Sequence, residues 1–395
     1  MNDLERFTAV CRGQAADYVP LIGLPGASGL AFGGAWGQIY QRLLDTGMPA
    51  SVQGWNYDTQ WDPRAAQSWS RYWGTLTPLH ADFWPCEPAE GIQSKKYLRD
   101  GYEVLEYNTG AVTRQVLDAQ NAYSMPDFVT YHVRDRESWE FYKKINTPGP
   151  LWSKEKMEQA CRGFDNRDKP LFMPLLSTWG AIRDLAGPEK ACTLLYDDPE
   201  LAREIIEWQS DLRRQYLFPL VERLKPEILK VGEDCCYNHG MLISPQHFLD
   251  FCGPAYREIV QWARSVGTEA VVVDTDGNIT QLIPLLDQLG VNGVYPVECK
   301  AGNDLFALRQ RFPEFIFFGW LEKEVINEGN EDMIEEEILS KVPGLLKTGR
   351  YFPNLDHSLQ PLCTHENVCR FLTCLHDATR NPLGQFPRAN YPKQK

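Results

Sequence analysis

From about residue 168 onward, short apolar runs alternate with longer stretches in which apolar residues recur at helical spacing. The apolar runs occupy residues 170–177, 227–234, 268–277, 292–298, 314–320 and 349–357. The helical stretches include residues 199–224, 244–267 and 330–346, and Ser244 followed by Pro245 is a typical helix start. Strands that are apolar almost throughout and that alternate with helices predict a parallel sheet covered on both faces.

The number of these units predicts an α/β fold closed into a (β/α)8 TIM barrel. The runs of the second half, residues 17–24 near the start and one further strand in the first half would together supply the strands of the barrel. An open, doubly wound sheet is the alternative. No GxGxxG pattern follows any of the strands, however, so the sequence does not indicate a dinucleotide site.

The first part of the chain is less regular. Its tryptophans include Trp36, Trp55, Trp61, Trp69, Trp73 and Trp84, which lie among turns and short segments. Residues 102–118 predict a hairpin that turns around Asn108–Gly110. We therefore expect one barrel domain over residues 1–395. Within it, residues 1–165 supply the first strand with aromatic-rich insertions or a cap, and residues 166–380 supply the regular units.

Ionisable residues follow nearly every strand of the second half, and in a parallel barrel all strands end at the same face. They are Glu233 and Asp234, Asp274 and Asp276, Glu298, Glu322 and Lys323, and Asp356 and His357. Crowded carboxylates oppose joint ionisation, so the set predicts a site for a metal ion, a positively charged substrate group or a proton-donating acid. Plainer interpretations remain open: Asp276 as a helix cap, and Asp274 as the partner of a lysine at the rim.

Composition narrows the class of partner. The 40 Lys and Arg residues against 53 Asp and Glu residues give a net charge of −13, which argues against a nucleic acid or an anionic membrane as partner. The opening residues lack a signal-peptide pattern and no apolar run is long enough to span a membrane, so we expect a cytoplasmic protein. The 11 irregularly spaced cysteines favour reduced thiols over a disulfide framework.

Several stretches resemble the uroporphyrinogen decarboxylase superfamily. They are GEDCCYNHGMLISPQHFLDFCGPAYREIVQWARSVG, VVVDTDGNITQLIPLLDQLGVNGVYPVECKAGNDLFALRQRFP and GRYFPNLDHSLQP, in the order that the superfamily shows. The likeness covers residues 168–378 well and the earlier part more weakly. The arginine-rich RQAGRY motif of true uroporphyrinogen decarboxylases is absent. So is the HxC zinc motif of the methyltransferases that hand a methyl group to a thiol, since Asp274, Thr275 and Asp276 stand at that strand end.

The set DTDG, PVE and NLDH instead resembles the branch of corrinoid-dependent methyltransferases that demethylate methyl ethers. This resemblance implies transfer of a methyl group from a methoxylated aromatic compound to the cobalt of a corrinoid (cobalamin) on a separate protein. Asp274, Asp276, Glu298 and His357 would form the catalytic floor, and Glu233, Asp234, Asp356, Trp36 and Trp179 would contact the substrate. The resemblance also allows a zinc ion held by Asp274, Asp276 and His357, and it leaves a homodimer open.

Other functions remain open at this stage. A decarboxylase or other lyase acting on a smaller carboxylic acid would need a cationic anchor, for which Lys323, Arg183 and Arg309 are candidates. Transfer of a methyl group from a methylated corrinoid to an acceptor, or binding of an aromatic ligand without catalysis, would also fit a barrel of this composition.

Overall fold

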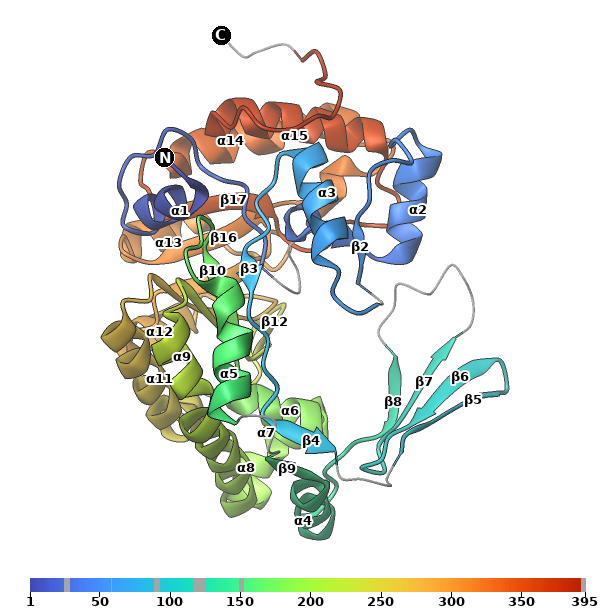
Figure 1. Cartoon of the computed structure of the whole chain (residues 1–395), viewed down its shortest axis with the longest axis vertical. Coiled ribbons are helices and arrows are strands. Elements are labelled where there is room, and N and C mark those ends of the chain that lie inside the picture. Colours follow the sequence, from blue (N-terminus) through green and yellow to red (C-terminus); the bar gives the residue numbers. More distant parts are fainter. Residues whose placement is uncertain (25–28, 58, 89–92, 117–125, 149–152, 392–395) are drawn as a thin grey trace.

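The central feature of the fold is a curled parallel sheet surrounded by helices (Figure 1). The computed structural model describes residues 1–24, 29–57, 59–88, 93–116, 126–148 and 153–391. Seven strands pair in the order β17, β16, β15, β14, β11, β10, β3. Their bounds are β3 Leu79–His80, β10 Leu171–Leu175, β11 Ile228–Gly232, β14 Ala270–Asp274, β15 Gly293–Val297, β16 Ile316–Leu321 and β17 Tyr351–Leu355.

All six strands predicted in the second half are confirmed as neighbours in this sheet, because each apolar run overlaps one of them. Among its described residues, the first half contributes β3 and one parallel bridge between Ile22 and Leu76. Of the predicted eight-stranded barrel, the structure shows a curled parallel sheet of seven strands among the described residues. Its closure between β17 and residues 21–24 stays a prediction.

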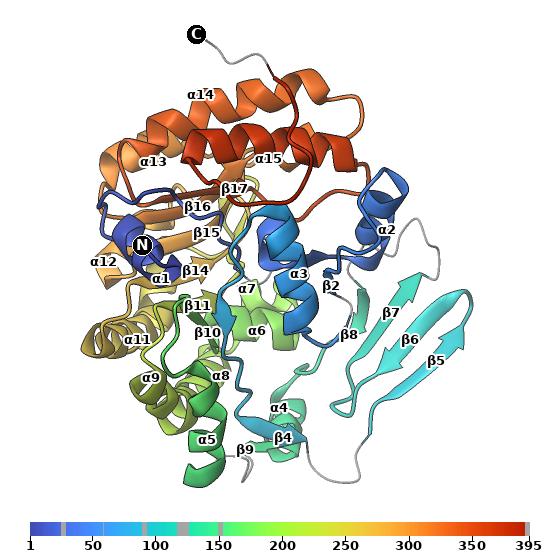
Figure 2. The ribbon, with the colours of Figure 1, turned by 45° about the horizontal axis from the view of Figure 1, so that its top comes forward.

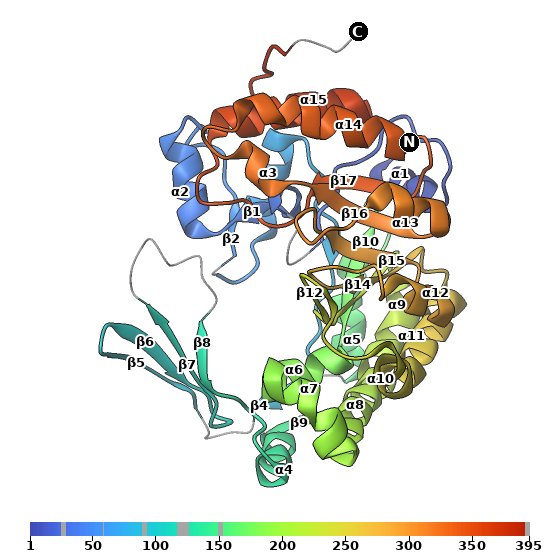
Figure 3. The same ribbon diagram turned by 180° about the vertical axis from the view of Figure 1, so that it is seen from behind.

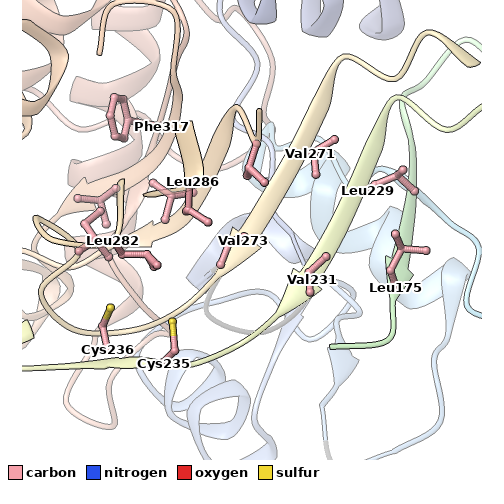
Figure 4. Packing of buried hydrophobic residues seen from close by; sticks show 14 of the residues in the cluster. Leu175, Leu229, Val231, Cys235, Cys236, Val271, Val273, Leu282, Leu286 and Phe317 are labelled. Carbon is pink, nitrogen blue, oxygen red and sulfur yellow. The ribbon is translucent and has the colours of Figure 1, made fainter. Parts of the chain in front are cut away.

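Alternate residues of each strand face two different cores, as strand geometry requires. The outer core packs Leu229, Val231, Val271 and Val273 against the helices; Figure 4 shows these side chains with Leu282 and Leu286 of α12 (Ile283–Leu289 and the turn before it). The inner core takes the intervening positions of the strands, and α1 (Asp3–Cys11) closes it from one end. Its members are Phe7, Val10, Cys11, Ile22, Leu24, Leu76, Phe172, Ile228, Ala270, Val272, Tyr295, Ile316, Phe318 and Phe352.

Helices cover the outer face between successive strands. Their bounds are α6 Trp179–Ala186, α7 Pro188–Asp197, α8 Pro199–Leu212, α9 Phe218–Leu224, α10 Pro245–His247, α11 Gly253–Val266, α13 Leu305–Arg311, α14 Ile334–Leu346 and α15 His365–Thr379. The predicted start at Ser244 is confirmed, since its side chain accepts a hydrogen bond from the His247 amide. Two stretches expected to be continuous helices contain π-helical turns, Arg213–Leu217 and Phe248–Cys252. Figure 2 shows α14 and α15 side by side along one side of the sheet.

The first half adds shorter elements. They are α2 Gly37–Asp45, α3 Pro63–Trp73, α4 Arg136–Ile145, α5 Lys154–Cys161, β1 Gly34–Ala35, β2 Trp55–Asn56, β4 Cys86–Pro88 and β9 Asn146–Pro148. The predicted hairpin is confirmed as β6 (Tyr102–Glu106) and β7 (Val112–Val116), with Gly110 at a φ of 83° in the turn. The end of the predicted stretch, residues 117–118, lies outside the described residues. β5 (Lys95–Arg99) and β8 (Asp127–Thr130) extend the hairpin to a four-stranded sheet that projects beside the helices (Figures 1 and 3).

Two observations concern the expected absence of a membrane span and the expected reduced state of the cysteines. Among the described residues, no helix has both the length and the apolar character needed to cross a membrane. All 11 cysteines are free thiols, and only Cys192 and Cys299 are less than fully buried.

The inner core makes a direct prediction about stability. Replacing Ile228, which is 0% exposed, with alanine removes apolar contacts on every side and should lower the free energy of unfolding by about 2–5 kcal/mol. Leu98→Ala is the matched control, because Leu98 is 69% exposed and its loss should change stability by no more than about 0.5 kcal/mol. Denaturant unfolding of both variants measures this, and equal effects would contradict the placement of Ile228.

Candidate active site

Two polar residues extend the inner face of the sheet beyond its apolar layer. Lys230 lies two residues after Ile228 in β11, and Asp274 lies two residues after Val272 in β14, so both side chains point inward with their apolar neighbours. They form a largely buried ion pair. The interpretation of Asp274 as the partner of a lysine is thus the one that the geometry supports, although that lysine comes from inside a strand.

His357 and Asp276 meet where the loops after β14 and β17 come together. Nε2 of His357 lies 3.7 Å from Oδ2 of Asp276. Burial is the largest single cause and would raise the pKa of Asp276, but the contact with His357 and the positive charges of Lys323 and Arg183 together hold this pKa below its ordinary value. Burial alone would lower the pKa of His357, and the Asp276 carboxylate reverses this and raises it. In the neutral ring the Ser358 amide donates to Nδ1 of His357 at 2.7 Å, which leaves the ring proton on Nε2, the nitrogen that faces Asp276.

Glu298 and Asp356 fix the loops around this pair. Glu298 accepts a hydrogen bond from the Gly277 amide at 2.8 Å and lies 3.4 Å from Nζ of Lys323. Asp356, only 1% exposed, accepts from the amides of Cys299 at 2.9 Å and Lys323 at 3.0 Å. Glu298 therefore supports the loop that carries Asp276, whereas Asp356 is enclosed by the backbone that it holds.

The two acids after β11 have different surroundings. Asp234 is paired with Arg183 of α6, and its other oxygen accepts from the Asp276 amide at 3.4 Å. Glu233 is fully buried and accepts four hydrogen bonds from protein groups. Trp179 is also fully buried, with its indole N–H donating to the Ala191 carbonyl at 3.3 Å. Neither Glu233 nor Trp179 presents a free surface to a ligand in this structure.

An aromatic cluster from the first half adjoins the inner face. It consists of Phe32, Trp36, Trp55, Tyr57, Trp61 and His80. Its rings meet at centroid distances such as 4.8 Å for Trp55 and Trp61 and 5.9 Å for Trp61 and His80. His80, at the end of β3, lies 5.1 Å from Phe172 of the inner core. The cluster thus brings Trp36, one of the predicted substrate residues, into a group of rings next to the strands.

His80 of this cluster is close enough to Lys230 to feel its positive charge. Burial is the main cause that lowers the pKa of His80; Asp82 opposes the effect and the positive charge of Lys230 adds to it. The side chain is consequently neutral near pH 7, when it can both donate and accept a hydrogen bond. Sequence reasoning missed both His80 and Lys230. The position of Lys230, two residues from an apolar inner residue, was the signal that could have found it.

The acids that gather at this edge have cations beside them, and the pKa of Asp276 is lowered from its ordinary value. The physical reason is that basic side chains accompany the acids: Lys230 with Asp274, Arg183 with Asp234, His357 with Asp276, and Lys323 with Glu298. Arg309 is not part of this group. It is buried at the other end of the sheet, where it donates to the carbonyls of Phe315 and Arg350 just before β16 and β17.

The residues expected to hold zinc do not fit such a site as they lie. The carboxylate of Asp274 is occupied by Lys230, which leaves only Asp276 and His357 in contact with each other. Within the part of the chain that the structure describes, no group of three or more His, Cys, Asp or Glu side chains is placed to hold a metal ion. Zinc stays a prediction from the resemblance, and no chemical step below uses it. Burial also raises the pKa of Cys299, which opposes a thiolate at this rim.

Comparisons with known proteins agree with this architecture. The family model described as uroporphyrinogen decarboxylase (URO-D) matches residues 133–378, more than half of the chain. The search of curated proteins gives no match. Among solved structures, a methyltransferase from Methanosarcina mazei is similar with a TM-score of 0.57, covering 96% of this chain and 98% of that chain at 14% identity. At this identity the likeness establishes a shared fold.

The contact between Asp276 and His357 predicts a measurable titration. In NMR titrations the pKa of His357 should lie above the ordinary 6.5, and Asp276→Asn should lower it because the stabilising carboxylate is lost. A histidine whose pKa is raised by folding stabilises the folded state fully below the unfolded pKa, and this contribution disappears as pH rises through the raised value. The stability difference between wild type and Asp276→Asn should therefore shrink with rising pH. A His357 pKa that is insensitive to the substitution would contradict the pairing.

Proposed function

The chain belongs to the uroporphyrinogen decarboxylase family, and within this family we propose that it is a methyltransferase acting on a methoxylated aromatic compound. The methyl group passes to the cobalt of a corrinoid that a separate protein carries. The observation that carries the proposal is the His357–Asp276 pair at the end of the sheet, together with a cluster of aromatic rings that contacts the inner core through His80 and Phe172. The DTDG, PVE and NLDH motifs, which resemble those of methyl ether demethylases, support the choice of reaction.

Cleavage of an aryl methyl ether needs a proton at the oxygen that leaves. The bond between this oxygen and the methyl carbon breaks with its electron pair on oxygen, and reduced cobalt supplies the pair for the new bond to carbon. His357 acts as the imidazolium, protonated at Nδ1 as well once the Ser358 amide no longer donates to that atom, and gives its Nε2 proton to the departing phenolic oxygen. The nearby Asp276 carboxylate stabilises the imidazolium before transfer. Solvent then returns the proton to His357, so the site is restored.

The substrate ring is assigned to the aromatic cluster. Trp36, Trp55 and Trp61 offer large flat faces and edges, which favour stacking with an aromatic ring. Lys230, Asp274 and His80 supply hydrogen-bonding groups beneath it. The corrinoid protein would dock over the same end of the sheet, because the methyl carbon must be approached in line with the breaking bond.

The fold proposed for this reaction is the closed (β/α)8 barrel, completed by residues 21–24 between β3 and β17. Ile22 and Leu24 belong to the same inner core as Phe352 of β17. The side chain of Asn354 in β17 also donates to the Ile22 carbonyl at 3.4 Å. These contacts support a ring of strands around one inner core, with the polar residues at its open end.

Decarboxylation of a smaller acid is less well supported. An anchor for a substrate carboxylate needs a cation that is available, but Arg183 is paired with Asp184 and Asp234, and Lys323 lies between Glu298 and Asp356. Arg309 is at the opposite end of the sheet. The paired charges favour a neutral substrate, as a methoxylated aromatic ring is. Transfer in the other direction, from a methylated corrinoid to an acceptor, would use the same His357–Asp276 pair.

The cytoplasmic location and the homodimer stay predictions.

Substitution of either residue of the His357–Asp276 pair tests the proposal. With reduced cobalamin and a panel of methoxylated benzenes, Asp276→Asn and His357→Gln should each lower the rate of cobalt methylation by about 10²–10⁴-fold, because proton donation is lost. Asp100→Asn is the control: its side chain is 84% exposed, and a φ of 50° is one that asparagine tolerates. The cobalt absorption spectrum reports the rate. Demethylation by Asp276→Asn at the parental rate would refute the assignment.

A further inference from the structure

The segment between β10 and α6 is held by two buried charges that do not touch each other. Leu176 to Gly180 form this segment, which follows the end of β10 and includes the first turn of α6. Arg213 and Glu233 approach it from different elements, and both are 0% exposed. A single charge buried without a partner is strongly unfavourable, so such an arrangement needs a structural reason.

Arg213 binds the carbonyl groups of the segment. Its Nη1 donates to the carbonyl oxygen of Leu176 at 2.6 Å and to that of Ser177 at 3.1 Å, while Nη2 donates to Ser210 at 2.7 Å. Arg213 begins the π-helical turn after α8, where the helical hydrogen-bond pattern changes. Burial lowers its pKa to about 10, and the negative charge of Glu233 opposes this effect.

Glu233 binds the amide groups of the same segment. Its carboxylate accepts from the Thr178 amide at 2.9 Å, the Thr178 hydroxyl at 2.6 Å and the Gly180 amide at 2.7 Å. A fourth hydrogen bond comes from the hydroxyl of Tyr256 in α11 at 2.8 Å. The carboxylate thus replaces the usual N-cap side chain of α6, for the Thr178 hydroxyl makes no cap hydrogen bond of its own.

The first turn of α6 also approaches the end of β11 too closely for a side chain. A Cβ atom on Gly180 would lie 2.5 Å from the carbonyl oxygen of Gly232 and 3.0 Å from Cα of Glu233. One turn further, Arg183 is paired with Asp234, which accepts from the Asp276 amide. α6 is therefore fastened to β11 at two successive points, and the second point leads to the loop of Asp276.

We infer that Arg213 and Glu233 form a clamp on Leu176–Gly180 that positions α6, and through Arg183 and Asp234 the Asp276 loop, for the reaction. Glu233 is then a positioning residue in place of the substrate ligand expected from the sequence. The clamp itself follows from the contacts above, while its effect on methyl transfer rests on the proposed function. The aromatic cluster belongs to other segments, so the clamp should act on the chemical step more than on binding of the ring.

Hydrogen exchange tests the clamp without any need for activity. In Glu233→Gln the amide group of glutamine replaces one acceptor oxygen, so peptides covering residues 174–183 should exchange at least tenfold faster than in wild type. Glu227→Gln is the matched control. Glu227 lies before the same strand and binds a backbone amide, that of Leu171, together with Arg167. Its loss should leave exchange of residues 174–183 unchanged, and equal exchange in Glu233→Gln and wild type would overturn the clamp.

Coupling between the two charges is the second readout. Glu233→Gln and Arg213→Gln should each lower the melting temperature, because each leaves the opposite charge buried. The double variant should be less destabilised than the sum of the two. Additive shifts in melting temperature would overturn the coupling of Arg213 and Glu233 through Leu176–Gly180. Where a single variant fails to fold, recovery of folding by the double variant gives the same answer, and failure of the double variant as well counts against it.

Kinetics separate positioning from a purely structural role. Glu233→Gln should lower kcat for methyl transfer at least tenfold while KM for the aromatic substrate changes by less than about twofold, since the ring cluster is untouched. Glu227→Gln should retain the parental kcat. Faster exchange with an unchanged kcat would overturn the positioning role. A wild-type protein that transfers no methyl group would instead refute the proposed function, and the exchange and coupling experiments would still decide on the clamp.

Discussion

Parallel pairing of β10, β11, β14, β15, β16 and β17 is the constraint on which the site depends. Because these strands run in one direction, every loop that follows them emerges at the same edge. Successive side chains along each strand point to opposite faces of the sheet, and this alternation decides which of them point inward. A shift of β11 by one residue would turn Lys230 into the outer core, next to Val273 and the helices, and bring Leu229 into the polar end of the sheet. The burial of both faces therefore enforces the position of the charges.

Charge balance follows from this enforced proximity. Carboxylates that gather at one edge of a sheet repel one another unless cations join them. In this chain the cations come from three kinds of place: the interior of a strand for Lys230, a neighbouring helix for Arg183, and the loops themselves for Lys323 and His357. The result is a site whose charges are satisfied internally. Internal pairing of this kind supports the proposed neutral methyl ether over a carboxylic acid, which would need a cation without a partner.

The sequence predicted those features that depend on local pattern. Continuous apolar runs located β10, β11, β14, β15, β16 and β17 within a few residues, and Asn108–Gly110 located the β6–β7 turn. Features set by tertiary contact were missed. β3 is two residues long, so His80 had no strand pattern around it. The π-helical turn at Arg213 looks like ordinary helix in sequence, because the spacing of apolar residues continues through it. Arg309 was expected near the acids, since helical spacing does not show which end of a sheet a side chain reaches.

Glu233 and Asp234 show why neighbours in sequence need not share a role. Glu233 directly follows the last residue of β11, and its side chain enters the closed space between α6 and α11, where four donors meet it. Asp234 has a φ of 47°, in the left-handed region that aspartate tolerates better than most residues. The chain direction changes there, so the next carboxylate reaches Arg183 and the Asp276 amide at the partly exposed edge. One backbone conformation thus divides an acidic pair into a buried support and a member of the site.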